Sequence, residues 1–183
     1  CNGTKYYKPP ECEYNDFELV SEVSMKDVLD HRTFKNLMIT LIEEQSCIDL
    51  HYLPLTGHFI SYRGSMINWC PIGRNANFVH YDTAYERTYR EQLKEKLERT
   101  LRHKNILKHL TVKFGGSTSF DIYPNGWDKR YCLTHFNDLD VWFVGDRCED
   151  GGNEGRSFKT EGVTQTRLII DEQIIPNLLQ NSE

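Results

Sequence analysis

The sequence predicts an α+β domain followed by a segment with α/β character. Apolar residues recur at helical spacing within residues 24–46 and again within 89–101. Alternating apolar and polar residues flank turn signals in residues 57–71 and 110–124, as in β-hairpins. Two helices against at least four antiparallel strands make an α+β lobe. The unbroken apolar run from Val141 to Val144 is instead typical of a parallel strand buried on both faces.

The N-terminal half alternates between extended and helical patterns. Residues 1–25 alternate polar and apolar side chains around a turn, as in short strands or a strand that enters a helix. Ser24 is a suitable N-cap, and the apolar residues that follow at intervals of three and four predict a helical region ending near Ser46. The segments 57–63 and 66–71 are separated by turn residues and predict a β-hairpin.

The second half begins with the clearest helix. Four residues recur every fourth position among charged side chains and predict a solvated helix with one buried stripe: Tyr89, Leu93, Leu97 and Leu101. The segments 110–114 and 119–124 predict a second hairpin around a Gly-Gly break. A short helix is expected at about 128–137, and a last strand and helix around 168–179.

Composition places the chain among globular proteins of ordinary size. It has 183 residues, of which 38% are hydrophobic and 27% charged, so it can bury a core without disulfide support. No apolar run approaches the roughly 20 residues that a membrane span requires. The net charge of -5 argues against a nucleic-acid partner, because such proteins usually present a net basic face. We therefore expect neither a membrane nor nucleic acid as a partner.

Six scattered cysteines form no C-x-x-C pair and no zinc-type cluster: Cys1, Cys12, Cys47, Cys70, Cys132 and Cys148. We interpret them as reduced thiols of a cytoplasmic protein. The even number also suits a secreted disulfide framework, and Asn2-Gly3-Thr4 is a formal glycosylation site, but such short matches are frequent by chance. The chain lacks an initiator Met and does not begin like a signal peptide, so we expect it to start inside a longer protein.

Two arginines and two residues of one strand are the first candidates for a binding site. Arg63 and Arg74 flank the first hairpin, and guanidinium forks suit phosphate oxygens; two unrelated surface arginines are the alternative. Ser119 and Asp121 are two apart in a strand and so share a face. A hydroxyl beside a carboxylate suits sugar hydroxyls, and a solvent-facing strand edge is the alternative.

Lys129 and Asp146 are candidates for phosphoryl chemistry. Asp146 ends the apolar run, and α/β sheets place catalytic and metal-binding carboxylates at the carboxyl ends of strands. A Lys and an Asp at strand ends are common in phosphoryl transfer, where the Lys holds phosphate and the Asp holds Mg²⁺. A structural salt bridge is the competing explanation.

Three stretches carry longer motifs in a fixed order. They are residues 59–68 followed by Pro71-Ile72-Gly73-Arg74, the long run 114–133, and Phe143-Val144-Gly145-Asp146 followed by Gly151-Gly152-Asn153. Together they resemble the eukaryotic phosphomannomutases, a branch of the haloacid dehalogenase superfamily. The run 114–133 is the most specific, and the resemblance spans nearly the whole chain before it fades towards the C-terminus.

The resemblance implies a mutase that interconverts mannose 6-phosphate and mannose 1-phosphate through an aspartyl-phosphate and a hexose bisphosphate, with Mg²⁺ as cofactor. It implies a cytoplasmic homodimer, joined through its caps, on the route to GDP-mannose. It also implies a fold, an α+β cap (antiparallel sheet with helices) inserted in an incomplete α/β haloacid dehalogenase-like core. Residues 1–24 would be a remnant of the core, 25–125 the substrate-binding cap and 126–183 the C-terminal part of the core.

The resemblance also assigns roles to seven residues. Five are substrate-binding: Arg63, Arg74, Ser119, Asp121 and Asn68. Lys129 matches the catalytic core lysine, and Asp146 matches the carboxylate that binds Mg²⁺.

Three features depart from the family's pattern. The nucleophile motif Asp-x-Asp-Gly-Thr occurs nowhere in the sequence, and we expect its place to lie upstream of Cys1. The position of the family's third cap arginine is Tyr81, whose phenol cannot make a bidentate phosphate contact. The family's Gly-Gly-Asn-Asp is Gly151-Gly152-Asn153-Glu154 here, and the second cation loop beyond Phe158 is too altered to align.

The missing nucleophile limits what this chain alone is expected to do. Without the aspartyl-phosphate neither half-reaction exists, so we expect the chain to be inactive as it stands. It is then part of a divergent phosphomannomutase, or a degenerate paralogue that binds a sugar phosphate or acts as a dimerising interaction protein. A sugar-phosphate phosphatase of the same superfamily is disfavoured because it needs the same Asp. The sequence upstream of Cys1 would distinguish the first two.

Overall fold

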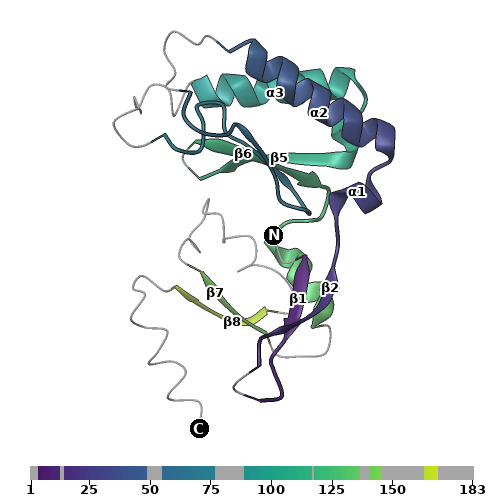
Figure 1. The fold of residues 1–183 in the computed structure, drawn as a ribbon, viewed down its shortest axis with the longest axis vertical. Helices are drawn as coiled ribbons and strands as arrows, with labels where there is room; N and C mark the ends of the chain where they lie inside the picture. The colour runs from purple at the N-terminus through teal and green to yellow at the C-terminus, as the bar shows by residue number, and fades with distance from the viewer. Residues whose placement is uncertain are drawn as a thin grey trace.

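The structure is a computed structural model, and it describes residues 4–12, 15–48, 55–76, 89–116, 118–136, 141–145 and 163–168. Its elements form two groups in space (Figure 1). In the first group, which we call the sheet lobe, two helices lie over a four-stranded sheet. The second group contains two separate two-stranded sheets and a short 3₁₀ helix.

The chain enters through a hairpin in the second group. β1 (Lys5–Lys8) pairs antiparallel with β2 (Glu18–Glu22), which confirms the short strands predicted for residues 1–25. An ion pair of 2.8 Å joins Lys5 Nζ to Glu22 Oε1 across the pair. After β2 the chain crosses into the sheet lobe.

Two helices occupy the region where the sequence predicts one. α1 (Met25–Val28) is capped by Ser24, whose hydroxyl accepts from the Lys26 N–H at 3.2 Å, as predicted. The helical path then breaks, and Asp30 caps α2 (His31–Ser46) by accepting from the Thr33 N–H at 3.0 Å. Hydrogen bonding from Thr33 lowers the pKa of the Asp30 carboxyl. The interval between apolar residues lengthens to five here, from Leu29 to Phe34, and the Asp30 cap marks the start of the second helix.

The two predicted hairpins join into one antiparallel sheet. The strands are β3 (Ile60–Tyr62), β4 (Ile67–Trp69), β5 (Leu110–Gly115) and β6 (Ser119–Pro124). Their spatial order is β3-β4-β6-β5, so the central pair β4–β6 links one hairpin to the other. At least four antiparallel strands were expected, and they are observed.

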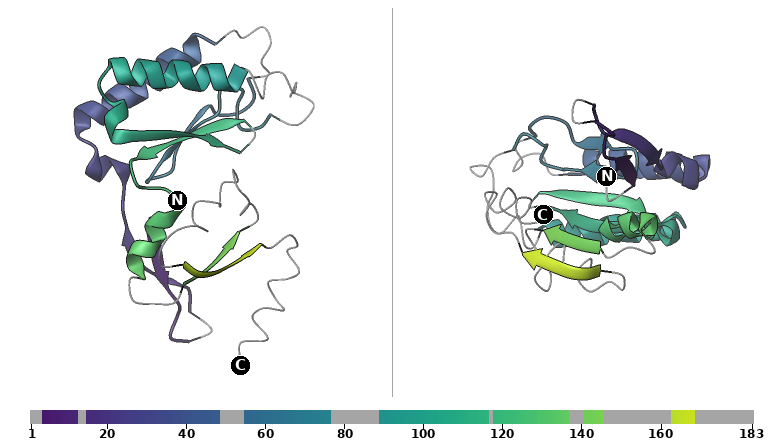
Figure 2. Two further views of the ribbon diagram at one scale, coloured as in Figure 1. Left: turned by 180° about the vertical axis from the view of Figure 1, so that it is seen from behind. Right: turned by 90° about the horizontal axis from the view of Figure 1, so that it is seen from below.

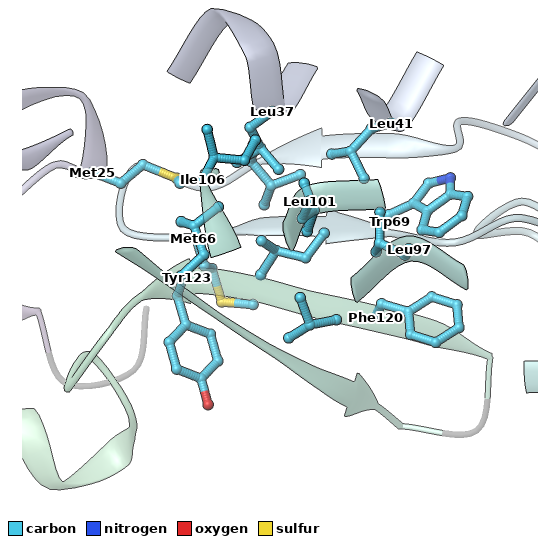
Figure 3. Packing of buried hydrophobic residues seen from close by; sticks show 14 of the residues in the cluster. Met25, Leu37, Leu41, Met66, Trp69, Leu97, Leu101, Ile106, Phe120 and Tyr123 are labelled. Atoms are coloured by element: carbon cyan, nitrogen blue, oxygen red, sulfur yellow. The ribbon is translucent and has the colours of Figure 1, made fainter. Parts of the chain in front are cut away.

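Helices α2 and α3 (Arg90–His103) cover one face of this sheet (Figures 1 and 2). α3 buries the predicted leucines at positions 93, 97 and 101. Trp69 and Phe120 lie beneath the helices, fully buried, with ring centroids 5.3 Å apart (Figure 3). Gln45 of α2 accepts from the Trp69 indole N–H at 2.8 Å and donates to the Pro71 carbonyl at 3.0 Å. This glutamine therefore ties the helix layer to the sheet.

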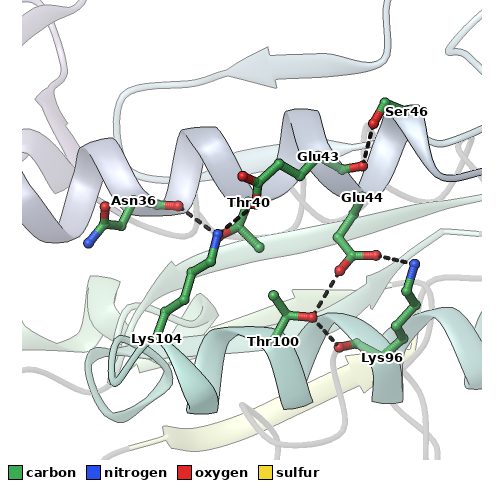
Figure 4. A network of polar contacts seen from close by, with 8 residues as sticks. All are labelled: Asn36, Thr40, Glu43, Glu44, Ser46, Lys96, Thr100 and Lys104. Atoms are coloured by element: carbon green, nitrogen blue, oxygen red, sulfur yellow. Dashed lines mark hydrogen bonds and ion pairs between the residues drawn. The ribbon is translucent and has the colours of Figure 1, made fainter.

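A polar seam joins the two helices (Figure 4). Glu44 is buried, and its carboxylate lies 2.7 Å from Lys96 Nζ and accepts from the Thr100 hydroxyl at 2.9 Å. Lys104 Nζ lies 2.6 Å from Glu43 Oε2. A buried carboxylate is tolerated only when it is paired and hydrogen-bonded, and both conditions hold here.

Of the remaining elements, η3 (Leu107–His109) belongs to the sheet lobe, where it contacts α3, and the others belong to the second group. η3 is a 3₁₀ turn that precedes β5, and η4 (Lys129–His135) is a 3₁₀ helix where a short helix was predicted. β7 (Val141–Gly145) pairs with β8 (Val163–Leu168) in parallel, which confirms the parallel strand inferred from the apolar run. β8 ends where the last strand was predicted to begin, and the predicted final helix lies outside the described residues.

Two expectations from composition can be compared with the described part of the chain. There, no helix combines the length and the apolar character that crossing a membrane requires. Cys12, Cys47, Cys70 and Cys132 are free thiols, in line with the reduced interpretation. Cys1 and Cys148 lie outside the described residues. The domain boundaries at 24/25 and 125/126 stay a prediction.

Candidate functional site

A polar row crosses the face of the sheet that carries no helix. Successive cross-strand partners form this row: Ser61, Asn68, Asp121 and Lys113. Directly paired residues share a face of a sheet. Their sequence neighbours Trp69 and Phe120 point the other way, into the core. The second group of elements lies on the side of the row (Figure 1).

Asn68 connects this row to two further polar residues, Ser119 and Arg74. Its amide nitrogen donates to Ser119 Oγ at 2.8 Å and to Asp121 Oδ1 at 2.6 Å. Its amide oxygen accepts from Arg74 Nη1 at 3.1 Å. The side chain is only 2% exposed, and both amide hydrogens are in use. A buried polar network with its hydrogen bonds made is rigid, so Asn68 fixes three of the predicted site residues relative to one another.

Ser119 and Asp121 share a face, as their spacing predicts. The Ser119 hydroxyl donates to the Gly115 carbonyl and accepts from Asn68. Ser119 is buried, whereas Asp121 is half-buried. Their geometry is therefore as inferred, and their part in binding a ligand stays a prediction.

Arg74 stands at the rim of the row, on a turn that requires glycine. Gly73 has φ +91°, and a Cβ there would lie 1.6 Å from the Thr56 carbonyl oxygen. The Arg74 N–H donates to the His58 carbonyl at 3.2 Å, which anchors its backbone. The guanidinium is exposed and uses Nη1 on Asn68. Its other N–H groups give it further donor capacity.

Arg63 lies at the opposite end of the β3–β4 hairpin from Arg74. Its N–H donates to the Met66 carbonyl at 2.9 Å and closes the turn, where Gly64 has φ +77°. It follows the last residue of β3, and alternation continued from Ser61 would put it on the face of the polar row. Its side chain is half-buried. The two arginines therefore lie at the two ends of one hairpin.

Of the two residues expected to carry phosphoryl chemistry, Lys129 belongs to the second group. Lys129 begins η4, and Asp146 follows β7 directly but lies outside the described residues, as Tyr81 does. Asp128 caps η4 by accepting from the Arg130 N–H at 3.0 Å, and its Oδ2 lies 2.7 Å from Arg130 Nη2. Burial raises the pKa of Asp128, but the hydrogen bonds from Arg130 outweigh it and the net pKa is lowered.

The described residues contain no group of three His, Cys, Asp or Glu side chains that could hold a metal ion. The assignment of Mg²⁺ to Asp146 therefore stays a prediction. What supports it here is the backbone: β7 and β8 are parallel, and Asp146 follows the carboxyl end of β7, where α/β sheets place such carboxylates.

Gly115→Ala is expected to displace the Asp121 carboxylate at a moderate cost in stability. A Cβ at residue 115 would lie 2.7 Å from Asp121 Oδ1, and a carboxylate at the end of a side chain can rotate away. The expected loss is about 1–3 kcal/mol, because the buried Asn68 amide loses one acceptor, and each kcal/mol lowers the melting temperature by about 3 °C. The side-chain amide resonances of Asn68 should shift because the bond to Asp121 is lost. Unchanged Asn68 resonances in a folded variant would contradict the geometry.

Comparison with known protein sequences gives the same family from a family model and from individual relatives. Residues 7–173 match the family described as eukaryotic phosphomannomutase. A phosphomannomutase of Encephalitozoon cuniculi is 35% identical over 166 residues, which cover 88% of this chain and 61% of that protein. A phosphomannomutase of Drosophila melanogaster is 32% identical over 153 residues, which cover 79% of this chain and 59% of that protein. The chain thus spans about three fifths of the length of these relatives.

One solved structure supports the fold. The IMP-nucleotidase of Plasmodium falciparum, in an N-terminally truncated form with IMP bound, aligns with a TM-score of 0.54 at 14% identity. The alignment covers 97% of this chain and 45% of that protein, so it includes elements of both groups.

Proposed function

Because the chain belongs to the eukaryotic phosphomannomutase family, we propose that it serves the interconversion of mannose 6-phosphate and mannose 1-phosphate, and that the polar row binds the sugar phosphate. One observation carries the location of the site. The buried amide of Asn68 bonds a guanidinium, a hydroxyl and a carboxylate at once. A guanidinium binds phosphate oxygens, and a hydroxyl and a carboxylate bind sugar hydroxyls.

The phosphate is assigned to the two arginines. A charge-assisted hydrogen bond to phosphate contributes about 1.5–3 kcal/mol before the costs of ordering and desolvation are subtracted. The bond from Arg74 to Asn68 lowers the ordering cost for that guanidinium, because it is already held at one nitrogen. Arg63 supplies a second positive charge from the other end of the hairpin.

The sugar is assigned to β6. The half-buried Asp121 carboxylate accepts from sugar hydroxyls. The Ser119 oxygen donates to Gly115 and accepts from Asn68, which leaves it one lone pair for a further hydroxyl. This arrangement favours a polyhydroxylated ligand that also carries a phosphate.

We extend the proposal to the organisation of the whole protein. Residues 25–125 form the cap, and 1–24 and 126–183 are parts of a haloacid dehalogenase-like core; the two groups of elements in Figure 1 support this division. Lys129 would hold the transferring phosphate, and Asp146 would bind Mg²⁺, whose charge stabilises the phosphoryl group when bound. A cytoplasmic homodimer joined through the caps, serving GDP-mannose synthesis, is what family membership supports.

A titration of mannose 1-phosphate, followed by ³¹P NMR of the ligand, tests the proposal. Two arginines on one open face should bind it with a dissociation constant on the order of millimolar, or about −4 kcal/mol. Arg74→Ala should abolish detectable binding. The matched control Arg102→Ala removes an exposed arginine of α3 and should bind like the wild type. Equal binding by wild type and Arg74→Ala would contradict the proposal, as would competition by mannose without a phosphate.

A further inference from the structure

Arg90 is a buried charge in the first turn of α3. Its side chain is only 4% exposed. It lies on the same stripe as the three leucines at 93, 97 and 101, where an apolar residue would pack without a desolvation cost. Burying a guanidinium is expensive, and a positive charge at a helix N-terminus also opposes the helix dipole. Packing alone therefore does not account for an arginine at this position.

The guanidinium bridges the two sides of the β5–β6 turn. Its Nη2 donates to the Gly116 carbonyl at 3.1 Å and to the Ser119 carbonyl at 2.9 Å. The guanidinium carbon lies 4.8 Å from the ring centroid of Phe114 and 5.7 Å from that of Phe120. These two rings are cross-strand partners immediately beside the turn. Arg90 thus holds the turn at its backbone and stacks against the strands that lead into it.

The turn is directly connected to the polar row. Ser119 is the first residue of β6, and its carbonyl accepts from Arg90 while its hydroxyl accepts from Asn68. Asn68 in turn bonds Asp121 and Arg74. Arg90 reaches this network through the Ser119 main-chain carbonyl, on the core side of the sheet.

We propose that Arg90 is a positioning residue of the sugar-phosphate site. It fixes the position of Ser119 at the start of β6. Through Asn68, it also fixes the positions of the Asp121 carboxylate and the Arg74 guanidinium. The charged side chain at this position serves the geometry of the site, because an apolar side chain would stabilise the core at least as well. The inference rests on the proposed function of the polar row.

Two substitutions of Arg90 in the 183-residue chain test this. Arg90→Met keeps the apolar volume and removes the donors. Arg90→Lys keeps the charge, but its shorter side chain ends before the position of Arg90 Nη2 and loses at least one of the two hydrogen bonds to the carbonyls of Gly116 and Ser119. With mannose 1-phosphate as the probe, we expect the affinity of Arg90→Met for this ligand to be about tenfold below that of the wild type. The decrease should be smaller for Arg90→Lys. The control Arg102→Met should bind like the wild type. The melting temperatures of the Arg90 variants should fall little or rise, whereas a purely structural role would lower melting temperature and leave affinity unchanged.

A second measurement separates this inference from the proposed function. In ligand-free, ¹⁵N-labelled protein, both Arg90 variants should shift the side-chain amide of Asn68 and the backbone amide of Ser119. This readout holds even if the wild type fails to bind mannose 1-phosphate, a result that would refute the proposed function alone. If Arg90→Met does not fold, Arg90→Lys decides. Wild-type Asn68 and Ser119 resonances in a folded Arg90 variant would overturn the positioning role.

Discussion

Gly73→Ala is expected to disrupt the turn that carries Arg74 and to abolish sugar-phosphate binding. A Cβ at this position would lie 1.6 Å from the Thr56 carbonyl oxygen and 2.4 Å from its carbon. Both atoms belong to the backbone, so no side-chain rotation relieves the overlap. Thr56 is itself held by hydrogen bonds between its N–H and the Ile72 carbonyl and between its carbonyl and the Asn75 N–H. The turn must therefore open, and Arg74 moves with it.

The expected loss of stability for Gly73→Ala is about 3 kcal/mol or more, which is the range of backbone strain combined with lost hydrogen bonds. Gly126→Ala is the matched control. Gly126 also has a positive φ, of +83°, but a Cβ there meets nothing within 4 Å, so only the conformational cost of about 1–2 kcal/mol applies. Urea denaturation of both variants gives the comparison. Equal losses would show that the close approach to Thr56 is wrong.

Trp69→Ala should cause a comparable loss from the core. Trp69 is fully buried beside Phe120, and its indole N–H donates to Gln45. Truncating a buried tryptophan costs about 3–5 kcal/mol, a large part of the roughly 5–15 kcal/mol that stabilises a typical domain. The midpoint of urea unfolding, followed by circular dichroism, measures this loss.

One further variant separates the hydrogen bond of Trp69 from its packing, and a second variant is a control at an exposed position. Trp69→Phe keeps much of the ring but leaves the half-buried Gln45 oxygen without its donor, which costs about 0.5–1.5 kcal/mol. Leu19→Ala removes a side chain that is 45% exposed and should change stability by no more than about 0.5 kcal/mol. A Trp69→Ala loss as small as that of Leu19→Ala would contradict the core described here.

Local patterns predict most of the fold because they need only neighbouring residues. The stripe of α3 and both hairpins follow from periodicity and turn residues. The break before α2 was not predicted, although two local signals mark it: the interval of five between Leu29 and Phe34, and Asp30, which caps the new helix. The burial of Arg90 was not predicted either, although the sequence contains a signal for it. Arg90 lies three residues before Leu93, on the buried stripe, and a charged residue at an apolar position points to a buried polar partner.

The organisation of the site depends on long-range register, which local patterns do not contain. The spacing of Ser119 and Asp121 predicts their shared face. That Asn68 bonds both follows only from the pairing of β4 with β6, across 51 and 53 positions of the chain. The family resemblance assigned Asn68, Arg74, Ser119 and Asp121 to the ligand without this link. The structure adds the reason they would act together, a single buried amide that orients all three partners.

The most direct test of the account is a map of the resonances that mannose 1-phosphate shifts in ¹⁵N-labelled protein. We predict the largest changes at the side-chain amide of Asn68 and the backbone amides of Arg74, Ser119 and Asp121. The β1–β2 hairpin and the exposed face of α2 should not change. Saturable shifts confined to those two regions, with Asn68 and its partners unmoved, would contradict the claim that the helix-free face of the sheet holds the sugar phosphate.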